Sequence, residues 1–484
     1  MPPAFRPFQP QDRGLRGGHI TAVLLAALAV TGCTAAYLHF RPAPPSMPSV
    51  EAGLVVAAPT PRDEPPPAPG LIDAVLSGPG RHTPTAASGL RRVPLDDTTM
   101  AQVEPLLGRA EARLIRVYQH IRAGDHRQAL KLAEHLARDH PNFQLAQLVL
   151  GDLLALRARP LRTLGDVPDI HGETATAQLA ALREESNQRI RALTERPPEG
   201  HVPRQFLALS PKNRHAIAID TSRSRLYLFE NLAPSDRSES RPATAPRLRL
   251  IGDYYISVGL QGIAKEVEGD QRTPLGVYYI TSTLDPRKLP DLYGVGALPI
   301  NYPNALDQQR GKTGSGIWLH GTPREQFVRA PQASDGCVVL SNQDLAFLLK
   351  TVRIRTTPVV IAQHLEWVVP DSLEQERQHF TRALDRWRQA RSTGDVQGLR
   401  AFYSKRFQPG GNDTRAWWRR MEAELRRPRP VQLKDTSLLK WQDSEETMVV
   451  TFGEVPVGQR RGTNRRQYWA LENGQWKIIY EGNT

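Results

Sequence analysis

The chain has 484 residues and a formal net charge of +13, with 63 lysines and arginines against 50 acidic residues. This length allows about three domains, and a hydrophobic content of 39% is sufficient for ordinary cores, which argues against global disorder. The excess of arginine favours anionic surroundings, such as carboxylate-rich cell-wall peptides or acidic lipid headgroups. A nucleic-acid partner is disfavoured, because the arginines are dispersed and no basic helix or zinc-finger spacing appears.

The N-terminal segment, residues 1–40, has the pattern of a membrane anchor. Three arginines precede a mainly apolar run over residues 20–40, which is long enough to cross a bilayer as a helix. Positive charge before the run predicts a cytoplasmic N-terminus, so the rest of the chain is expected in the periplasm, anchored to the inner membrane. A lipoprotein signal with Cys33 as the acylated residue is the competing interpretation. We favour the anchor, because the apolar run continues past Cys33.

Two segments follow before the chain changes to short strands. Residues 41–100 are rich in proline and alanine and are interpreted as an extended linker. Residues 101–197 have helical periodicity, with Leu114, Val117 and Tyr118 on one face and Gly124-Asp125 as a stop and a cap. The pattern over 124–154 resembles tetratricopeptide helical hairpins. That resemblance implies a docking module, for which an envelope protein is the candidate partner, and a plain packing domain without a partner is equally open.

Residues 205–365 are predicted to form a mostly β domain with one helix after Cys337. Ser341 is expected to cap that helix, which spans about 341–352. Glycine and proline punctuate short alternating segments, so Cys337 is expected in a loop between a strand and the helix. The expected strands are 216–220, 225–229, 249–258, 276–281, 316–319 and 358–362.

Residues 371–484 are predicted to form an α+β domain. A helix carrying Phe380, Leu384 and Trp387 precedes a second helix through Leu399 and Phe402. The order of elements resembles the nuclear-transport-factor-2-like cone, which implies a binding or placement module and a second possible site for an envelope partner. Four strands are expected, near 431–441, 448–452, 467–472 and 476–480.

Cys337 is one of only two cysteines, and it follows His320 by seventeen residues. An imidazole can take the proton of a thiol and stabilise the thiolate, so the pair predicts nucleophilic catalysis by acyl transfer. Gly336 fits a tight turn whose backbone N–H groups converge on a developing oxyanion. An inert buried cysteine is the alternative. A single cysteine in an exported segment has no internal disulfide partner, which favours chemistry.

The sequence around this pair resembles the L,D-transpeptidase (YkuD-type) catalytic domain over about residues 205–365. The resemblance lies in His320-Gly321-Thr322-Pro323, in Ser334-Asp335-Gly336-Cys337, in the segment 217–231 and in the segment 269–278. It implies that Cys337 is the nucleophile and that His320 is the general base and later the acid. The family usually has histidine at the position of Asp335 and often arginine at that of Val339. These departures leave open how the thiolate is oriented and how substrate charge is held.

Supporting roles are expected for the neighbours of the pair. The Gly321 carbonyl is expected to orient the imidazole, and the Gly336–Cys337 backbone to supply oxyanion donors. Ser334 is expected either to hold the loop or to hydrogen-bond His320, and Asp335 either to orient a neighbour or to be simply solvated. No metal or cofactor is expected, because HExxH, paired CxxC and His-rich patterns are absent. Residues expected to border the substrate groove are Arg272, Thr273, Asn301 and Tyr302.

The implied activity is ping-pong acyl transfer on peptidoglycan stem peptides. Cys337 would attack the carbonyl of the L-centre of a diamino acid, release the terminal D-amino acid, and pass the acyl group to an amine. A hydrolase on the same domain, with water as acceptor, is the nearest alternative. An inactive envelope binding protein, in which Cys337 is vestigial, is the more distant one.

Overall fold

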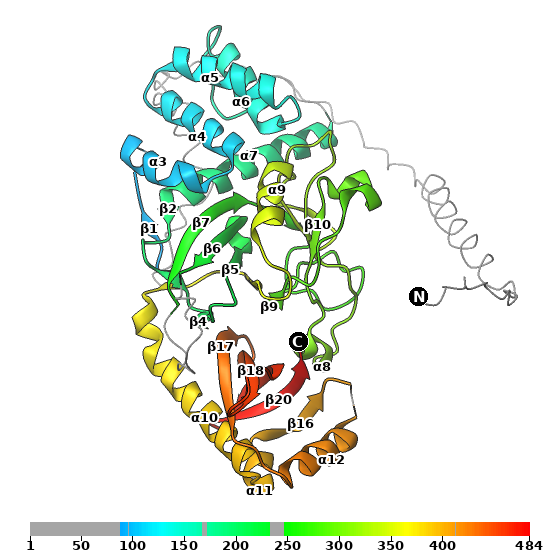
Figure 1. Ribbon diagram of the computed structural model, residues 1–484. Coiled ribbons are helices and arrows are strands. Elements are labelled where there is room, and N and C mark those ends of the chain that lie inside the picture. The colour runs from blue at the N-terminus through cyan, green and yellow to red at the C-terminus, as the bar shows by residue number, and fades with distance from the viewer. Residues whose placement is uncertain (1–87, 95, 167–171, 233–245, 412) are drawn as a thin grey trace, which may run out of the picture. The chain divides into compact units, whose positions relative to one another are not determined.

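The computed structural model describes residues 88–94, 96–166, 172–232, 246–411 and 413–484. The expected anchor, the lipoprotein signal at Cys33 and most of the expected linker lie outside these ranges. Among the described residues, no helix is both long and apolar enough to span a bilayer. The expected fold class is confirmed: a helical region precedes a mostly β domain, which an α+β domain follows (Figure 1).

The helical region begins inside the segment that was predicted to be a linker. A short strand β1 (Arg91–Arg92) pairs with β2 (Glu195–Arg196) after the last helix, so the end of that segment is part of the fold. Between α4 and α5, Gly124 takes a left-handed φ of 76°, and Asp125 caps α5 by accepting the amide of Gln128 at 3.1 Å. The helices are α3 (Asp97–Val103), α4 (Arg109–Arg122), α5 (His126–Asp139), α6 (Gln144–Ala155) and α7 (Glu173–Thr194).

The central β domain contains a five-stranded sheet in the order β7-β6-β5-β14-β9. Successive side chains of a strand point to opposite faces of the sheet, and both faces of this sheet are buried, each in a different core. Ile217 and Ile219 of β5 lie in the core of the domain itself, whereas Ala216 and Ala218 pack with residues of the C-terminal sheet such as Leu439. The strands are β5 (His215–Asp220), β6 (Arg225–Asn231), β7 (Leu248–Tyr255), β9 (Gly276–Tyr279) and β14 (Pro358–Ala362).

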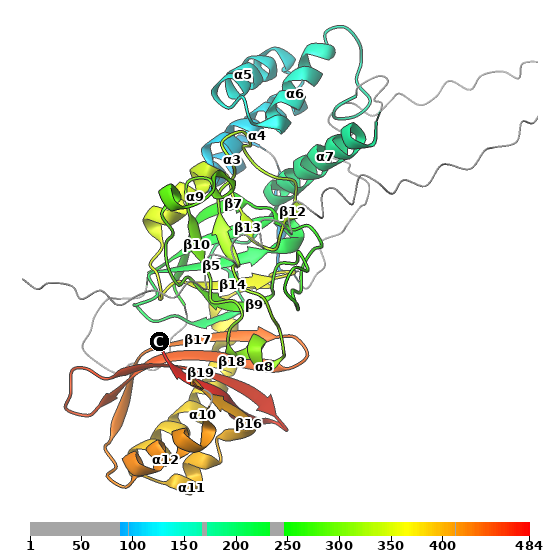
Figure 2. The same ribbon diagram turned by 90° about the vertical axis from the view of Figure 1, so that its right-hand side faces the viewer.

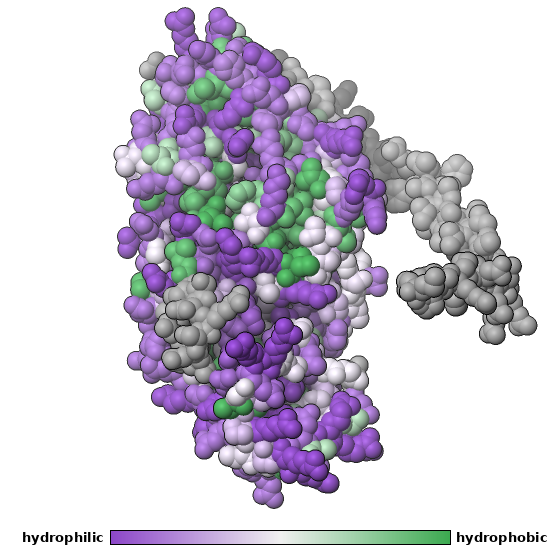
Figure 3. Space-filling model, viewed as in Figure 1, coloured by the Kyte–Doolittle hydropathy of each residue, from purple (hydrophilic) through white to green (hydrophobic). Residues whose placement is uncertain are grey.

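A smaller sheet in the order β10-β11-β13 carries His320 at the end of β11, and Cys337 directly precedes β13. Ser341 caps the helix that follows it, accepting the amide of Asp344 at 3.2 Å, as expected. Apolar residues reach the surface around α9, whereas the rest of the face in Figure 3 is mainly hydrophilic. The elements are β10 (Ala297–Pro299), β11 (Trp318–His320), β13 (Val338–Val339) and α9 (Asn342–Thr351), and nearby lie β8 (Val258–Gly259), β12 (Gln332–Ser334) and α8 (Ala305–Gln309).

The C-terminal domain packs three helices on one side of a six-stranded sheet (Figure 2). Phe380 and Trp387 of α10 face Trp469 in one core, whereas Phe402 lies just after α11. The sixth strand, β4 (Phe206–Ala208), comes from the segment assigned by sequence to the catalytic domain and pairs with β17. The other elements are α10 (Glu374–Thr393), α11 (Val396–Arg400), α12 (Thr414–Leu425), β16 (Tyr403–Pro409), β17 (Val431–Gln442), β18 (Glu446–Pro456), β19 (Thr463–Glu472) and β20 (Gln475–Asn483).

A buried ion network joins the helical region to the central sheet. Arg225 and Asp253, on β6 and β7, are fully buried and pair at 2.6 Å. Arg225 also bonds Glu111 of α4 at 2.8 Å, and Glu111 forms an ion pair with Arg189 of α7 at 2.8 Å. Buried charges are tolerated only when they are paired, so these contacts fix α4 and α7 against the sheet.

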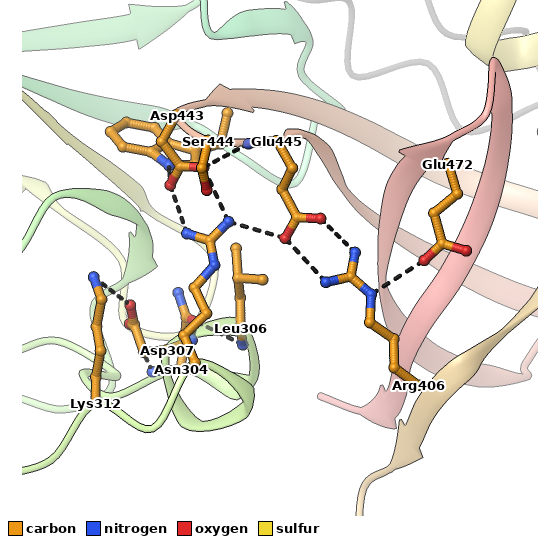
Figure 4. A network of polar contacts seen from close by, with 11 residues as sticks. Asn304, Leu306, Asp307, Lys312, Arg406, Asp443, Ser444, Glu445 and Glu472 are labelled. Atoms are coloured by element: carbon orange, nitrogen blue, oxygen red, sulfur yellow. Dashed lines mark hydrogen bonds and ion pairs between the residues drawn. The ribbon is translucent and has the colours of Figure 1, made fainter.

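A second polar network joins α8 to the C-terminal domain (Figure 4). Arg310, just after α8, bonds Asp443 at 2.5 Å and Glu445 at 3.0 Å. Glu445 also pairs with Arg406 of β16, which bonds Glu472 of β19 at 3.1 Å. The turn between β17 and β18 therefore contacts the central domain on one side and β16 on the other.

Candidate active site

The register of β11 and β13 brings the strand that carries His320 beside the strand that directly follows Cys337. The two strands are parallel, with Leu319 opposite Val338 and His320 opposite Val339. Leu319 and Val338 are fully buried in the core of the domain. Because side chains alternate along a strand, His320 and Val339 lie toward the other face, and Cys337 directly precedes β13.

His320 is held as a neutral imidazole with one free nitrogen. Its side chain is buried, and Nδ1 lies 2.7 Å from the carbonyl oxygen of Gly321, as the sequence led us to expect. A carbonyl only accepts, so Nδ1 carries the hydrogen and Nε2 is left as the proton acceptor. Burial lowers the pKa of His320 to about 4, although the Gly321 carbonyl acts in the opposite direction. The imidazole is therefore uncharged at neutral pH.

Cys337 is a half-buried free thiol whose Sγ lies 3.4 Å from the carbonyl oxygen of Gly316. Burial raises the pKa of the Cys337 thiol above its usual value. The negative charge of Asp335 also raises this pKa, and the positive charges of Arg329 and Lys265 lower it. The resting thiol is consequently protonated at neutral pH, so attack requires a base.

Ser334 holds the turn that carries Cys337. Its hydroxyl donates to the Cys337 carbonyl at 2.6 Å and accepts the Gly336 amide at 3.2 Å. The Gly336 amide, expected to be an oxyanion donor, thus has another partner. Gly336 itself has a φ of 113°, and a Cβ at this position would lie 2.6 Å from the Arg272 carbonyl oxygen. Glycine is therefore required by both backbone conformation and space.

Two of the four residues expected to border the groove are buried and structural. Thr273 is fully buried, and its hydroxyl donates to the Gly336 carbonyl at 3.0 Å and accepts the Gly259 amide at 2.8 Å. Tyr302 is buried in the core, and its hydroxyl donates to the Thr313 carbonyl at 3.2 Å. We correct the expectation for both side chains, because neither is open to a ligand.

The remaining predicted residues are less enclosed. Asp335 is exposed and accepts a hydrogen bond from Gln271 Nε2 at 2.9 Å. Arg272 is also exposed, and its guanidinium donates to the Ile263 carbonyl at 3.2 Å. Asn301 is half-buried and its Oδ1 accepts the Tyr279 amide at 2.7 Å. Asp335 and Arg272 therefore stay available to solvent at the turn formed by Ser334–Cys337, which is called the cysteine turn below.

Asn342 at the start of α9 is a positioning residue that the sequence reasoning missed. Its Oδ1 accepts the amides of Val295 at 3.1 Å and Thr322 at 3.3 Å, and its Nδ2 donates to the Thr322 carbonyl at 2.8 Å. A Cβ on Gly321 would lie 2.1 Å from this Oδ1. Asn342 thus fixes the backbone that orients His320. The only sequence signal at this position was the cap motif of α9.

Arg329 is the second missed residue, on the segment between β11 and β12. Its charge lowers the pKa of Cys337 and also lowers that of His320. No motif marks this arginine, so only the folded chain brings it to the site. Within the described ranges, no group of three or more histidine, cysteine, aspartate or glutamate side chains is arranged to hold a metal ion.

Family models match both domains that follow the helical region. Residues 214–361 match the L,D-transpeptidase catalytic domain (YkuD), and residues 379–482 match the Cds6 C-terminal NTF2-like domain. The chain therefore contains an L,D-transpeptidase-type catalytic domain followed by an NTF2-like domain. The resemblances to the L,D-transpeptidase catalytic domain and to the NTF2-like cone are confirmed.

Solved structures with similar folds include Bd1075 from Bdellovibrio bacteriovorus, with 24% identity over 59% of this chain and 98% of that chain, at a TM-score of 0.48. The helical cell shape determining protein Pgp2 from Campylobacter jejuni is 21% identical over 58% of this chain and 95% of its own, at a TM-score of 0.46. An L,D-transpeptidase from Mycobacterium smegmatis is 13% identical over 31% of this chain and 58% of its own, at a TM-score of 0.19. No curated protein sequence matches significantly.

Proposed function

We propose that the protein is a peptidoglycan L,D-transpeptidase in which Cys337 is the nucleophile and His320 the general base. The observation that supports this proposal is the parallel register of β11 and β13, which pairs His320 with Val339, two residues after Cys337. The Gly321 carbonyl supports the base assignment, because it leaves His320 Nε2 unprotonated and able to accept the thiol proton. No metal or cofactor is needed for this reaction.

In the acylation step, Sγ of Cys337 forms a bond to the carbonyl carbon of the diamino acid L-centre. His320 Nε2 takes the thiol proton as the bond forms, and the carbonyl oxygen becomes negative. We assign the Cys337 amide as an oxyanion donor, since the Gly336 amide is bonded to Ser334. The imidazolium then gives its proton to the amine of the terminal D-amino acid. That residue leaves, and a thioester forms on Cys337.

In the second step, an acceptor amine attacks the thioester carbonyl and His320 takes its proton. The new amide bond forms as the C–S bond breaks, and the proton returns to the thiol. Water as the acceptor would give a free carboxylic acid instead. Arg272 and Asn301 are proposed to border the stem peptide, and Asp335 to orient Gln271 beside it.

We place the catalytic domain in the periplasm, held to the inner membrane by residues 1–40. The length of the apolar run and the preceding arginines support this location. Metabolic labelling with palmitate tests the lipoprotein alternative, because an acylated Cys33 would incorporate the label whereas an uncleaved anchor retains its N-terminal residues. An envelope protein is proposed as a further partner of the helical region or the NTF2-like domain, and cross-linking in intact cells would identify it.

The test of activity is incubation of the full-length protein with purified muropeptides, followed by mass analysis of the products. We expect dimers with an L,D cross-link and release of the terminal D-amino acid. The variant Cys337→Ala should form no product and no covalent adduct with a carbapenem. The matched control is Cys33→Ala, which removes the other cysteine and should leave both readouts unchanged.

The same experiment separates the alternatives. Shortened monomers without dimers would identify a hydrolase that uses water as acceptor. Product formation by Cys337→Ala would overturn the nucleophile assignment. A parent protein that is folded but gives neither product nor adduct would identify the inactive binding protein.

A further inference from the structure

Arg329 is bound at the base of the cysteine turn. It lies in residues 323–331, which connect β11 to β12 and are called the 323–331 segment below. Its guanidinium donates from Nη1 to the Ala333 carbonyl at 3.3 Å. The next residue, Ser334, donates to the Cys337 carbonyl. Two hydrogen bonds therefore separate the guanidinium from the backbone of the nucleophile.

The electrostatic effects of Arg329 on Cys337 and His320 agree with its position beside the cysteine turn. The positive charge of Arg329 lowers the pKa values of both Cys337 and His320, although burial dominates both shifts. Burial lowers the pKa of Arg329 itself, and the charges of Asp335 and Cys337 raise it. Such mutual effects require the guanidinium to lie near the thiol, the imidazole and the Asp335 carboxylate.

Arg329 differs from the other cation near the thiol. Lys265 is buried, and its ammonium is already bound by the Asp270 carboxylate at 2.7 Å and the Val267 carbonyl at 2.9 Å. For Arg329, the described residues include no carboxylate at ion-pair distance, and the Ala333 bond uses one of five N–H donors. A half-buried guanidinium with free donors is suited to bind a carboxylate from outside the chain.

We propose that Arg329 binds a carboxylate of the stem peptide beside Cys337, and that the helical region holds Arg329 in position through the 323–331 segment. This inference rests on the proposed transpeptidase function. The Arg329 guanidinium would supply the positive charge that is missing at position 339, where a buried valine stands. That charge also explains how the site tolerates the negative charge of Asp335 on the same turn.

The helical region holds the 323–331 segment by backbone and ring contacts. The Phe327 amide donates to the Asn142 carbonyl at 3.2 Å, and Asn142 Nδ2 donates to the Arg324 carbonyl at 2.9 Å. The Phe327 ring stacks on Phe143 with 4.5 Å between centroids and belongs to the core of the helical region. The connection between α5 and α6 thus fixes the position from which Arg329 reaches the cysteine turn.

A second contact fixes the other side of Arg329. The hydroxyl of Tyr255, at the end of β7, donates to the Arg329 carbonyl at 3.0 Å. The centroid of the Tyr255 ring lies 4.0 Å from the guanidinium carbon of Arg189 on α7. Arg329 is therefore held between two contacts that both lead to helices of the helical region.

The test compares a stem tetrapeptide that ends in a free carboxylate with the same peptide ending in a carboxamide. The parent protein should prefer the free carboxylate. Arg329→Gln should raise KM for the carboxylate peptide about 10- to 100-fold, the usual loss for a charged hydrogen bond, and should change KM for the carboxamide little. Arg329→Lys should restore part of the preference. The matched control is Arg324→Gln, an exposed arginine of the same segment, which should behave as the parent.

A double-mutant cycle tests the role of the helical region. Phe327→Leu keeps an apolar side chain in the core but removes the stack on Phe143. It should raise KM for the carboxylate peptide only, and the effect should disappear in the Arg329→Gln background. Additive effects of the two changes would refute the positioning of Arg329 by the helical region. Thermal melting of each variant identifies any loss of folding.

The outcomes separate this inference from the proposed function. If Arg329→Gln retains the carboxylate preference while Cys337→Ala is inactive, the carboxylate site is refuted and the transpeptidase assignment stands. A uniform fall in kcat for both peptides would likewise refute a carboxylate site. If Cys337→Ala retains activity, both proposals fail.

Discussion

The Gly321 carbonyl oxygen lies 2.7 Å from Nδ1 of His320. A carbonyl fixes the tautomer of an imidazole without supplying a negative charge. An aspartate at that position would stabilise the imidazolium form, whereas the carbonyl does so only weakly. The base is thus oriented but left with a low proton affinity, which determines its pH behaviour.

The pH dependence of kcat/KM should have an acid limb near pH 4. Burial lowers the pKa of His320 to about 4, so the imidazole stays deprotonated and able to act as a base down to about pH 5. An unperturbed histidine would lose activity below about pH 6.5. Initial rates of carbapenem acylation between pH 4 and 8 measure this limb. An acid limb close to 6.5 would contradict the burial of His320.

His320→Gln should slow acylation by about two to four orders of magnitude, because a glutamine cannot take the thiol proton. Single-turnover acylation by a carbapenem measures the effect, and thermal melting should show little change in stability. A suitable control is His379→Gln, since His379 lies on α10 in the C-terminal domain. A variant that acylates as fast as the parent would show that another group activates Cys337.

Gly321→Ala should impair catalysis by displacing the orienting carbonyl. A Cβ at this position would lie 2.1 Å from Asn342 Oδ1 and 3.2 Å from the Tyr293 carbonyl oxygen, so the backbone or Asn342 must move. We expect a fall in kcat together with a lower melting temperature. The double variant Gly321→Ala/Asn342→Ala relieves the closest contact and should recover part of the stability. Unchanged kcat in the single variant would argue against the close approach.

Val339→Arg should destabilise the domain. The family often has arginine at this position, so if the side chain at 339 faced the substrate, an arginine would change the ratio of cross-linked to hydrolysed product. The alternative is simple destabilisation. The structure supports the alternative, because Val339 is 2% exposed and exchanges two backbone bonds of 2.9 Å with Ser257. Burying an unpaired guanidinium should cost several kcal/mol of unfolding free energy.

Chemical denaturation of Val339→Arg measures this loss, with Val369→Arg as the control at a half-exposed valine. A variant that is as stable as the parent and forms products in a new ratio would restore the original expectation.

Glu111→Ala should destabilise the contact between the helical region and the catalytic domain. It leaves the buried guanidinium groups of Arg225 and Arg189 short of one partner, which typically costs about 3–5 kcal/mol. Glu104→Ala is the matched control, because Glu104 pairs with Arg116 at the surface, where an ion pair contributes at most about 1 kcal/mol. Equal urea midpoints for the two variants would contradict a structural role for the buried network.

The order of the domains was predictable because local signals carry it. Alternation and turn residues indicated the strands, and the expected strand 358–362 coincides with β14. The cap at Ser341 and the carbonyl partner of His320 were also expected. Each depends on residues close together in the sequence, where spacing determines geometry.

The features that the sequence did not reveal depend on contacts between distant segments. Thr273 and Arg272 are adjacent in sequence, yet one is fully buried and the other is exposed, and only the packed turn distinguishes them. Arg329 is one arginine among many and has no motif around it. Its place near Cys337 follows from Phe327 binding the α5–α6 connection, a long-range contact that periodicity does not encode.

The pairing of β4 with β17 has a consequence for how the chain folds during synthesis. Ala208 leaves the ribosome long before its partner Leu438 has been made. Because β17 is the only partner of β4 among the described strands, β4 therefore stays unpaired until almost the whole polypeptide exists. Such a late, non-local closure slows folding and ties the completion of the catalytic domain to that of the C-terminal domain. A truncation after residue 371 would leave β4 without its sheet and expose the buried Phe206 and Leu207, so premature termination should yield an aggregating product rather than a free catalytic domain.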